Sequence, residues 1–82
     1  MLSLESIRIV DAIARHASFR AAATALGKVP SALTYTVRRL ETELDVLLFD
    51  RRGRGARLTP AGLELLRQGR QLLLASEQIA AQ

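Results

Sequence analysis

The stretch "VPSALTYTVRRLE", residues 29–41, is the part of the sequence that best predicts the fold. Pro30 suits the first turn of a helix, because the amide hydrogen that proline lacks would be unpaired there in any case. Apolar residues then recur at intervals of four, three and four, as on the buried side of an amphipathic helix. These residues are Leu33, Val37, Leu40 and Leu44. The sequence therefore predicts a helix over about residues 30–44 with one face in a core.

The opposite face of this predicted helix is polar and basic. Hydroxyl, phenol and guanidinium groups gather there, and such groups suit a negatively charged partner. On a helical wheel this face holds Ser31, Thr34, Tyr35 and Arg38, with Arg39 further round at its edge. A merely solvated face would show the same pattern, so the neighbouring elements have to decide between the two interpretations.

Two shorter helices are predicted upstream, which gives a helix-turn-helix order. Apolar residues at helical spacing predict a first helix that Ser3 could cap and that ends near His16, for which a surface or capping role is expected. Ser18 offers the cap of a second, alanine-rich helix. Gly27 then stands where the end of a helix favours a residue with positive φ.

The stretch "LLFDRRGRGARLTPAG", residues 47–62, differs in character. It predicts two short strands, over residues 47–50 and 56–58, joined by a tight or mobile turn with two glycines. This hairpin, the wing, concentrates positive charge, with only Asp50 nearby to offset it. Its arginines are Arg51, Arg52, Arg54 and Arg57. Thr59 and Pro60 are a typical cap and first residue of a fourth helix.

Composition limits the function classes. The 82 residues make one small domain with a formal charge of +4, and 11 of the 12 basic residues are arginine, which pairs with phosphate in bidentate geometry. No apolar run approaches the roughly 20 residues of a membrane-spanning helix. With one histidine and no cysteine, no catalytic group can be proposed, so we expect no enzyme, metal or cofactor. We expect a soluble, cytoplasmic protein with a polyanionic partner.

In this order and spacing, four segments resemble the N-terminal DNA-binding domain of a LysR-type transcriptional regulator. They are "SFRAAATAL" (18–26), "SALTYTVRRLE" (31–41), "LLFDR" (47–51) and "RLTPAG" (57–62). The resemblance implies a mainly α fold, a winged helix-turn-helix with a three-helix core and a small β-hairpin wing. A long linker helix over residues 60–82 would follow the domain of residues 1–59, and the family's effector-sensing domain would lie outside this sequence.

The resemblance also implies contacts with double-stranded DNA. The helix over residues 30–44 would enter the major groove and the wing the adjacent minor groove. Base contacts are expected from Pro30, Ser31, Thr34, Tyr35 and Arg54. Contacts to the DNA backbone are expected from Ser18, Phe19, Arg20, Thr36, Arg38, Arg39, Arg51, Arg52 and Arg57.

The linker helix of the family pairs antiparallel with a second copy. Leu65, Leu72 and Ile79 repeat every seven residues, as the seam between two helices does. A homodimer on a partly palindromic site is therefore expected, with a tetramer possible for a longer protein and a small-molecule effector bound elsewhere. The leucines in the first half of this helix are expected to cover the core of the domain itself.

Three residues depart from the family pattern. Pro30 replaces a common glutamine and can offer a base only apolar contact, for instance to a thymine methyl. Lys28 replaces a buried aliphatic residue, and Val29 is expected to take over its packing. Asp45 replaces a glycine after the third helix, where it is expected to adopt a left-handed conformation.

Two questions stay open at this level. Arg51 could pair with Glu41 or Glu43 instead of a phosphate, and neither role is favoured. The module could also bind a protein and not DNA, although the wing arginines and the polar helix face argue against that alternative.

Overall fold

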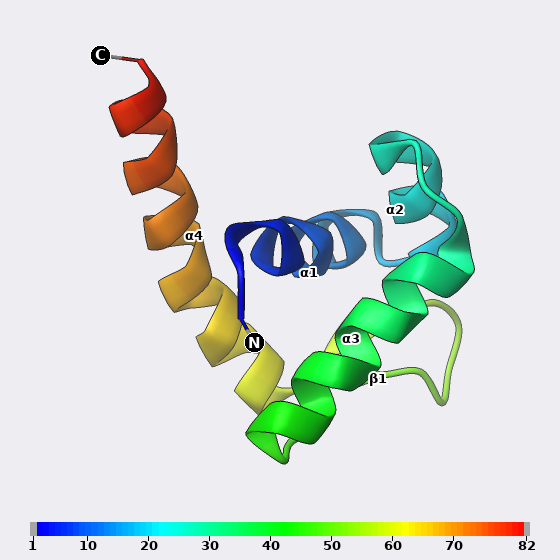
Figure 1. Cartoon of the computed structure of the whole chain (residues 1–82). Helices are drawn as coiled ribbons and strands as arrows, with labels where there is room; N and C mark the ends of the chain where they lie inside the picture. The colour runs from blue at the N-terminus through cyan, green and yellow to red at the C-terminus, as the bar shows by residue number, and fades with distance from the viewer. Residues whose placement is uncertain (1, 82) are drawn as a thin grey trace.

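A computed structural model of the chain describes residues 2–81 and confirms the mainly α, winged helix-turn-helix fold. The elements are α1 (Leu4–His16), α2 (Phe19–Leu26), α3 (Pro30–Leu44), β1 (Phe49–Asp50), β2 (Arg57–Leu58) and α4 (Pro60–Ala80). In Figure 1, α1 lies between α4 on one side and α2 with α3 on the other. Gln82, the last residue of the predicted linker helix, lies outside the described residues.

The helix ends follow the capping residues that the sequence indicates. Ser3 forms a capping box at the start of α1. The hydroxyls of Ser18 and Thr59 accept hydrogen bonds from backbone amides at 3.1 and 3.0 Å. Gly27 and Asp45 end α2 and α3 in left-handed conformations, with φ of 67° and 55°. These local predictions are confirmed because each depends on only a few neighbouring residues.

The buried face of α3 packs into the core with α1 and α2. Leu33, Val37 and Leu40 are buried, as predicted, but Leu44 is 43% exposed. Leu44 belongs to the last turn of α3, where it lines a surface hollow beside Val46 and does not reach the core. The predicted apolar stripe is therefore wrong at its last position.

The wing is a two-stranded antiparallel sheet, in which Phe49 pairs with Leu58 and Asp50 with Arg57. The strands are shorter than predicted because neighbouring amides have other acceptors. The Leu48 amide donates to the Glu41 carboxylate at 2.8 Å, and the Ala56 amide donates to the Ala17 carbonyl at 3.0 Å. The first bond gives Glu41 a structural role in connecting α3 to the wing. These acceptors hold the wing against the helices that precede it.

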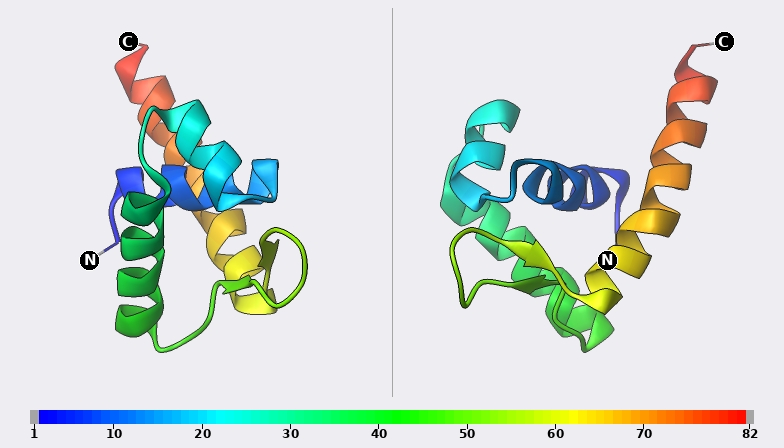
Figure 2. Two further views of the ribbon diagram at one scale, coloured as in Figure 1. Left: turned by 90° about the vertical axis from the view of Figure 1, so that its right-hand side faces the viewer. Right: turned by 180° about the vertical axis from the view of Figure 1, so that it is seen from behind.

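The long helix α4 packs against α1 and then extends past it (Figures 1 and 2). Leu66 and Leu73 are buried on its inner side. Elsewhere along the helix Leu63, Leu72, Leu74 and Ile79 are exposed. Among the described residues, we find no helix with the length and apolar character needed to cross a membrane.

Candidate nucleic-acid interface

The polar face of α3 is exposed, and its members lie together as the helical wheel predicts. They line a shallow surface hollow formed by Ser31, Thr34, Tyr35, Arg38, Arg39, Thr42 and Glu43. The Tyr35 side chain is 63% exposed, so its phenol belongs to this surface and not to the core. Pro30, one turn earlier, is also exposed. Hydroxyl, phenol and guanidinium groups are thus available on one side of a rigid helix.

The two arginines of α3 differ in how they are held. Arg39 lies 3.5 Å from Glu43 and places its guanidinium 5.9 Å from the centre of the Tyr35 ring. Arg38 forms no ion pair with any residue that the structure describes. Arg38 is therefore the more available of the two for an external anion.

The wing arginines are also not equivalent. Arg52 donates to both carboxylate oxygens of Asp50, at 3.0 and 2.8 Å. These hydrogen bonds from Arg52 lower the pKa of the Asp50 carboxyl to about 2, so the pair stays ionised even in moderately acid solution. Arg54 and Arg57 have no such carboxylate partner within residues 2–81. The net positive charge of the wing therefore resides on these two side chains and on Arg51.

At the start of α2, Phe19 is buried and holds a wing arginine in place. The Arg51 guanidinium lies 3.8 Å from the centre of the Phe19 ring, and the Phe49 ring meets Phe19 edge-on at 5.6 Å. The alternative pair of Arg51 with Glu41 or Glu43, which the sequence leaves open, is not among the ion pairs of the described residues. Arg51 is held instead by a cation–π contact, which leaves its outer edge open.

The start of α2 offers backbone groups and one cation. Because the Phe19 ring is buried, a contact from Phe19 to a phosphate would have to use its backbone amide. The Ser18 hydroxyl already accepts from the Ala21 amide, and Arg20 is exposed. This helix end lies beside the stacked Arg51, since Phe19 belongs to its first turn.

Val29 and Thr36 occupy different surroundings beside α3. Val29 is 62% exposed, so the expectation that it fills a buried position is wrong. It precedes Pro30 in an extended conformation outside the core, while Lys28 pairs with Glu5 of α1 at 3.1 Å. Thr36 lines a hollow between α1 and α3 that shares Tyr35 and Arg39 with the hollow containing Thr34 and Arg38, and its contact with the DNA backbone stays a prediction.

The three residues of the predicted dimer seam have different environments. Leu65 is half-buried and packs against the core, whereas Leu72 and Ile79 are 51% and 74% exposed. A surface hollow beside Leu65 and Leu72 is lined further by apolar residues of other segments, including Leu2 and Val46. The exposed apolar surface of α4 is therefore concentrated toward its second half.

Comparison with known proteins gives the family. The model of the bacterial regulatory helix-turn-helix proteins of the lysR family matches residues 4–63. The chain belongs to this family. It is a LysR-type helix-turn-helix domain, and the resemblance noted in the sequence is confirmed.

Relatives and solved structures agree with this assignment. The probable HTH-type transcriptional regulator YhaJ of Escherichia coli strain K12 is 54% identical over 78 residues, which are 95% of this chain and 26% of YhaJ. The regulator PunR of the same strain is 52% identical over 73 residues, or 89% of this chain and 24% of PunR. The LysR-type chain thus spans about a quarter of the length of these curated relatives.

Two solved complexes with DNA have the same fold. The BenM DBD with benA site 1 DNA has a TM-score of 0.92 and 28% identity, covering 98% of this chain and 90% of that chain. The complex of the CbnR DBD with DNA has a TM-score of 0.91 and 28% identity, covering 98% and 92%. This likeness covers nearly all of the chain, so it continues along α4 beyond residue 63, where the match to the family model ends.

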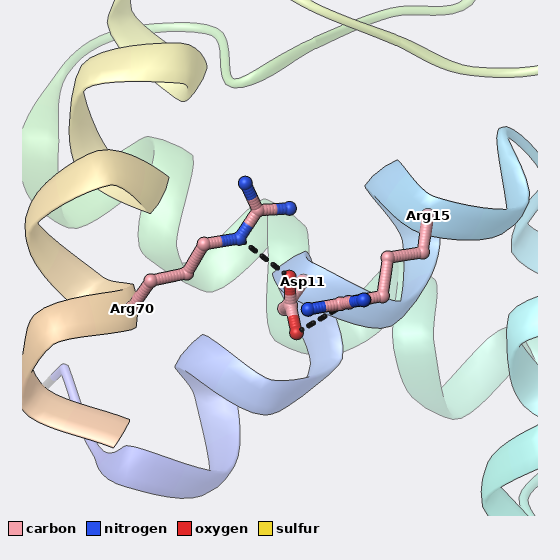
Figure 3. A network of polar contacts seen from close by, with 3 residues as sticks. All are labelled: Asp11, Arg15 and Arg70. Atoms are coloured by element: carbon pink, nitrogen blue, oxygen red, sulfur yellow. Dashed lines mark hydrogen bonds and ion pairs between the residues drawn. The ribbon is translucent and has the colours of Figure 1, made fainter. Parts of the chain in front are cut away.

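One polar network of this LysR-type domain was missed by sequence reasoning. Asp11 of α1 accepts from Arg70 of α4 at 2.9 Å and from Arg15 at 3.0 Å (Figure 3). The Asp11 side chain is only 16% exposed. The network joins α4 to the helix-turn-helix. The Asp11–Arg15 pair has the i,i+4 spacing of neighbours on a helix, but no sequence pattern indicates the contact with Arg70, which is 59 positions from Asp11.

Proposed function

We propose that this LysR-type domain binds double-stranded DNA with sequence specificity, as part of a bacterial transcription regulator that acts in the cytoplasm. α3 enters the major groove and contacts base edges through its polar face. Arg54 of the wing enters the adjacent minor groove. The helix-turn-helix geometry and the DNA complexes of the BenM and CbnR domains support this arrangement.

The observation that carries the proposal is the distribution of unpaired cations around the polar face of α3. Among the described residues, Arg38 on that face and Arg54 and Arg57 on the wing form no ion pair, and the Asp50 carboxylate beside Arg57 is already paired with Arg52. A solvated surface with no partner has no need to keep three guanidinium groups free beside a row of hydroxyls. The phosphates of DNA would supply the missing negative charge.

Affinity and specificity come from different groups in this arrangement. Guanidinium groups displace counterions from phosphates, which makes binding strong at low salt and weak at high salt. Ser31, Thr34 and Tyr35 present hydroxyls that can donate or accept one hydrogen bond at a base edge and so distinguish between bases. Pro30 can add only apolar contact.

We further propose that two copies pair through the outer side of α4. Exposed Leu72 and Ile79 are seven residues apart and would form the seam. A two-fold axis between the copies would place two α3 helices on a partly palindromic site. Tetramer formation and the binding of a small-molecule effector belong to the proposed longer protein, in keeping with the length of the relatives.

Binding to random-sequence double-stranded DNA over a salt series, followed by sequencing of retained fragments, tests the proposal. The wild type, Arg54→Ala and the control Arg67→Ala are compared. We expect an enriched motif with two-fold symmetry and a steep salt dependence for the wild type and the control. Arg54→Ala should lose affinity chiefly where the flank is rich in A and T, whose narrow minor groove attracts arginine. No enrichment at low salt would instead favour a module that binds a protein.

A further inference from the structure

The loop of the wing between its two strands (residues 51–56) is held on both sides, by the turn that follows α1 and by the first residue of α2. On one side, the Arg51 guanidinium stacks on the Phe19 ring at 3.8 Å. On the other side, the amide of buried Ala56 donates to the Ala17 carbonyl at 3.0 Å. Figure 2 shows the loop projecting from the domain, with Arg54 in the sequence between these two contacts.

Near the second contact, Ala17 and Gly55, which precedes Ala56 in the chain, both have an uncommon backbone conformation. Ala17 ends α1 with φ of 54°, a left-handed conformation that residues with a β-carbon seldom adopt. Gly55 has φ of 73°, and a β-carbon at this position would collide with the Ala17 carbonyl oxygen. The loop therefore approaches this turn more closely than any residue but glycine allows. Gly53, on the other side of Arg54, has no atom within 4 Å of the place where its β-carbon would lie.

We propose that Gly55 and Ala17 are positioning residues for Arg54 at the tip of the wing. The close approach at Gly55 fixes the backbone from which the neighbouring Arg54 side chain extends. Because Ser18 and Phe19 of the same turn start α2, the wing and the helix-turn-helix move as one body. The distance between the polar face of α3 and the tip of the wing is thereby set before DNA is met.

Gly55 and Ala17 would thereby influence which DNA sites are bound, although neither residue contacts a base. A wing that is free to move would have to be ordered on binding, which costs affinity. With a fixed wing, tight binding instead requires an A/T-rich minor groove at a set distance from the bases that α3 contacts. This inference rests on the proposed function, because it assigns the position of Arg54 relative to the bound site.

The test is a double-mutant cycle in the 82-residue chain. Gly55→Ala and the matched control Gly53→Ala are each made in the wild type and in Arg54→Ala. Affinity is measured on the selected site with an A/T-rich or a G/C-rich flank. We expect Gly55→Ala to weaken binding about five- to tenfold on the A/T-rich flank, the cost of ordering one long side chain. Gly53→Ala should have little effect, and Gly55→Ala should add nothing when Arg54 is already alanine.

An equal loss on both flanks, or the same loss in the Arg54→Ala background, would overturn the inference while leaving the proposed function intact. Failure of the wild type to bind any DNA would remove the proposed function itself. A second measurement needs no DNA. NMR relaxation of the backbone amides of residues 53–56 should show an ordered loop in the wild type and Gly53→Ala, and a mobile loop in Gly55→Ala. Equal order in all three chains would also overturn it.

Discussion

The helices α3 and α4 have similar apolar inner faces, but their exposed faces differ in polarity. Each buries an apolar stripe, exemplified by Leu33 in α3 and Leu66 in α4, which are 0% and 1% exposed. The outer face of α3 carries hydroxyls, Tyr35 and Arg38. The outer face of α4 carries apolar side chains such as Leu72 and Ile79. Two amphipathic helices in one domain are therefore suited to different partners.

The arginines of the two helices sharpen this difference. On α4, Arg67 lies 2.7 Å from Glu64 and Arg70 lies 2.9 Å from Asp11, so both positive charges are locally balanced. On α3, Arg38 has no carboxylate partner within the described residues. Composition alone treats these arginines as equal. Their partners show which can bind an external anion without first breaking an ion pair.

The largest predicted effect concerns the shared inner face. Leu33→Ala and Leu66→Ala should each lower the free energy of unfolding by about 2–5 kcal/mol, because each leaves a cavity in the core. The matched control is Leu63→Ala, since Leu63 is on α4 but 61% exposed. Urea unfolding followed by circular dichroism provides the measurement. A small effect of Leu66→Ala would mean that α4 is an appendage and not part of the folded domain.

The second prediction concerns the outer face of α4. The double variant Leu72→Arg/Ile79→Arg should raise the dimer dissociation constant by about tenfold or more, because it places charges in an apolar seam. Gln71→Arg/Gln78→Arg adds the same charge one position earlier on the helix and serves as the control. Sedimentation equilibrium gives both constants. If the dimer dissociation constants of the two double variants rise equally, the added net charge weakens pairing and the apolar seam does not govern it.

The third prediction compares one arginine from each helix. Arg38→Gln should reduce the steepness of log affinity against log salt by about 0.9, the value for one phosphate contact. Arg67→Gln removes the same charge from α4 and should leave the slope unchanged. Fluorescence anisotropy on one DNA fragment over a KCl series measures both slopes. Equal changes would show that only the total charge of the domain matters.

The sequence predicts the features that short segments determine. Caps such as Ser18 and Thr59, and the left-handed Asp45, were foreseen because local chemistry decides them. The polar face of α3 and the charge of the wing were also predicted from spacing and composition. Contacts between distant segments were not predicted, since local spacing and composition do not show which distant side chains meet. The stacking of Arg51 on Phe19 is one such contact.

The exposure of Val29 shows a different limit. A hydrophobic residue in a tight turn was expected to fill the core, yet the turn leaves it 62% exposed. The assigned DNA contacts, the domain boundary at residue 59 and the dimer seam stay predictions. For these, the structure shows which side chains are available and the variants above decide their roles.

The smallest predicted effect comes from the ion pair on the outer side of α4. Hydrogen bonds from Arg67, and then from Gln68, lower the pKa of the Glu64 carboxyl from its ordinary value of 4.5 to about 2. Because the folded pKa is below the unfolded one, the unfolded chain binds more protons between these values. The contribution of Glu64 to stability is thus complete above about pH 4.5 and is lost as the pH falls through about 2.

Glu64→Gln should therefore flatten the dependence of stability on pH within this acid range, and only slightly, because water screens an exposed pair. Urea midpoints measured from neutral pH down to about pH 2 test this slope. Glu77→Gln is the control, since Glu77 is on the same helix and has no ion pair among the described residues. The same flattening in both variants would mean that Arg67 is not held by Glu64 in solution. Arg67 would then be as free as Arg38, and the contrast between the two helices would have to rest on their apolar and hydroxyl side chains alone.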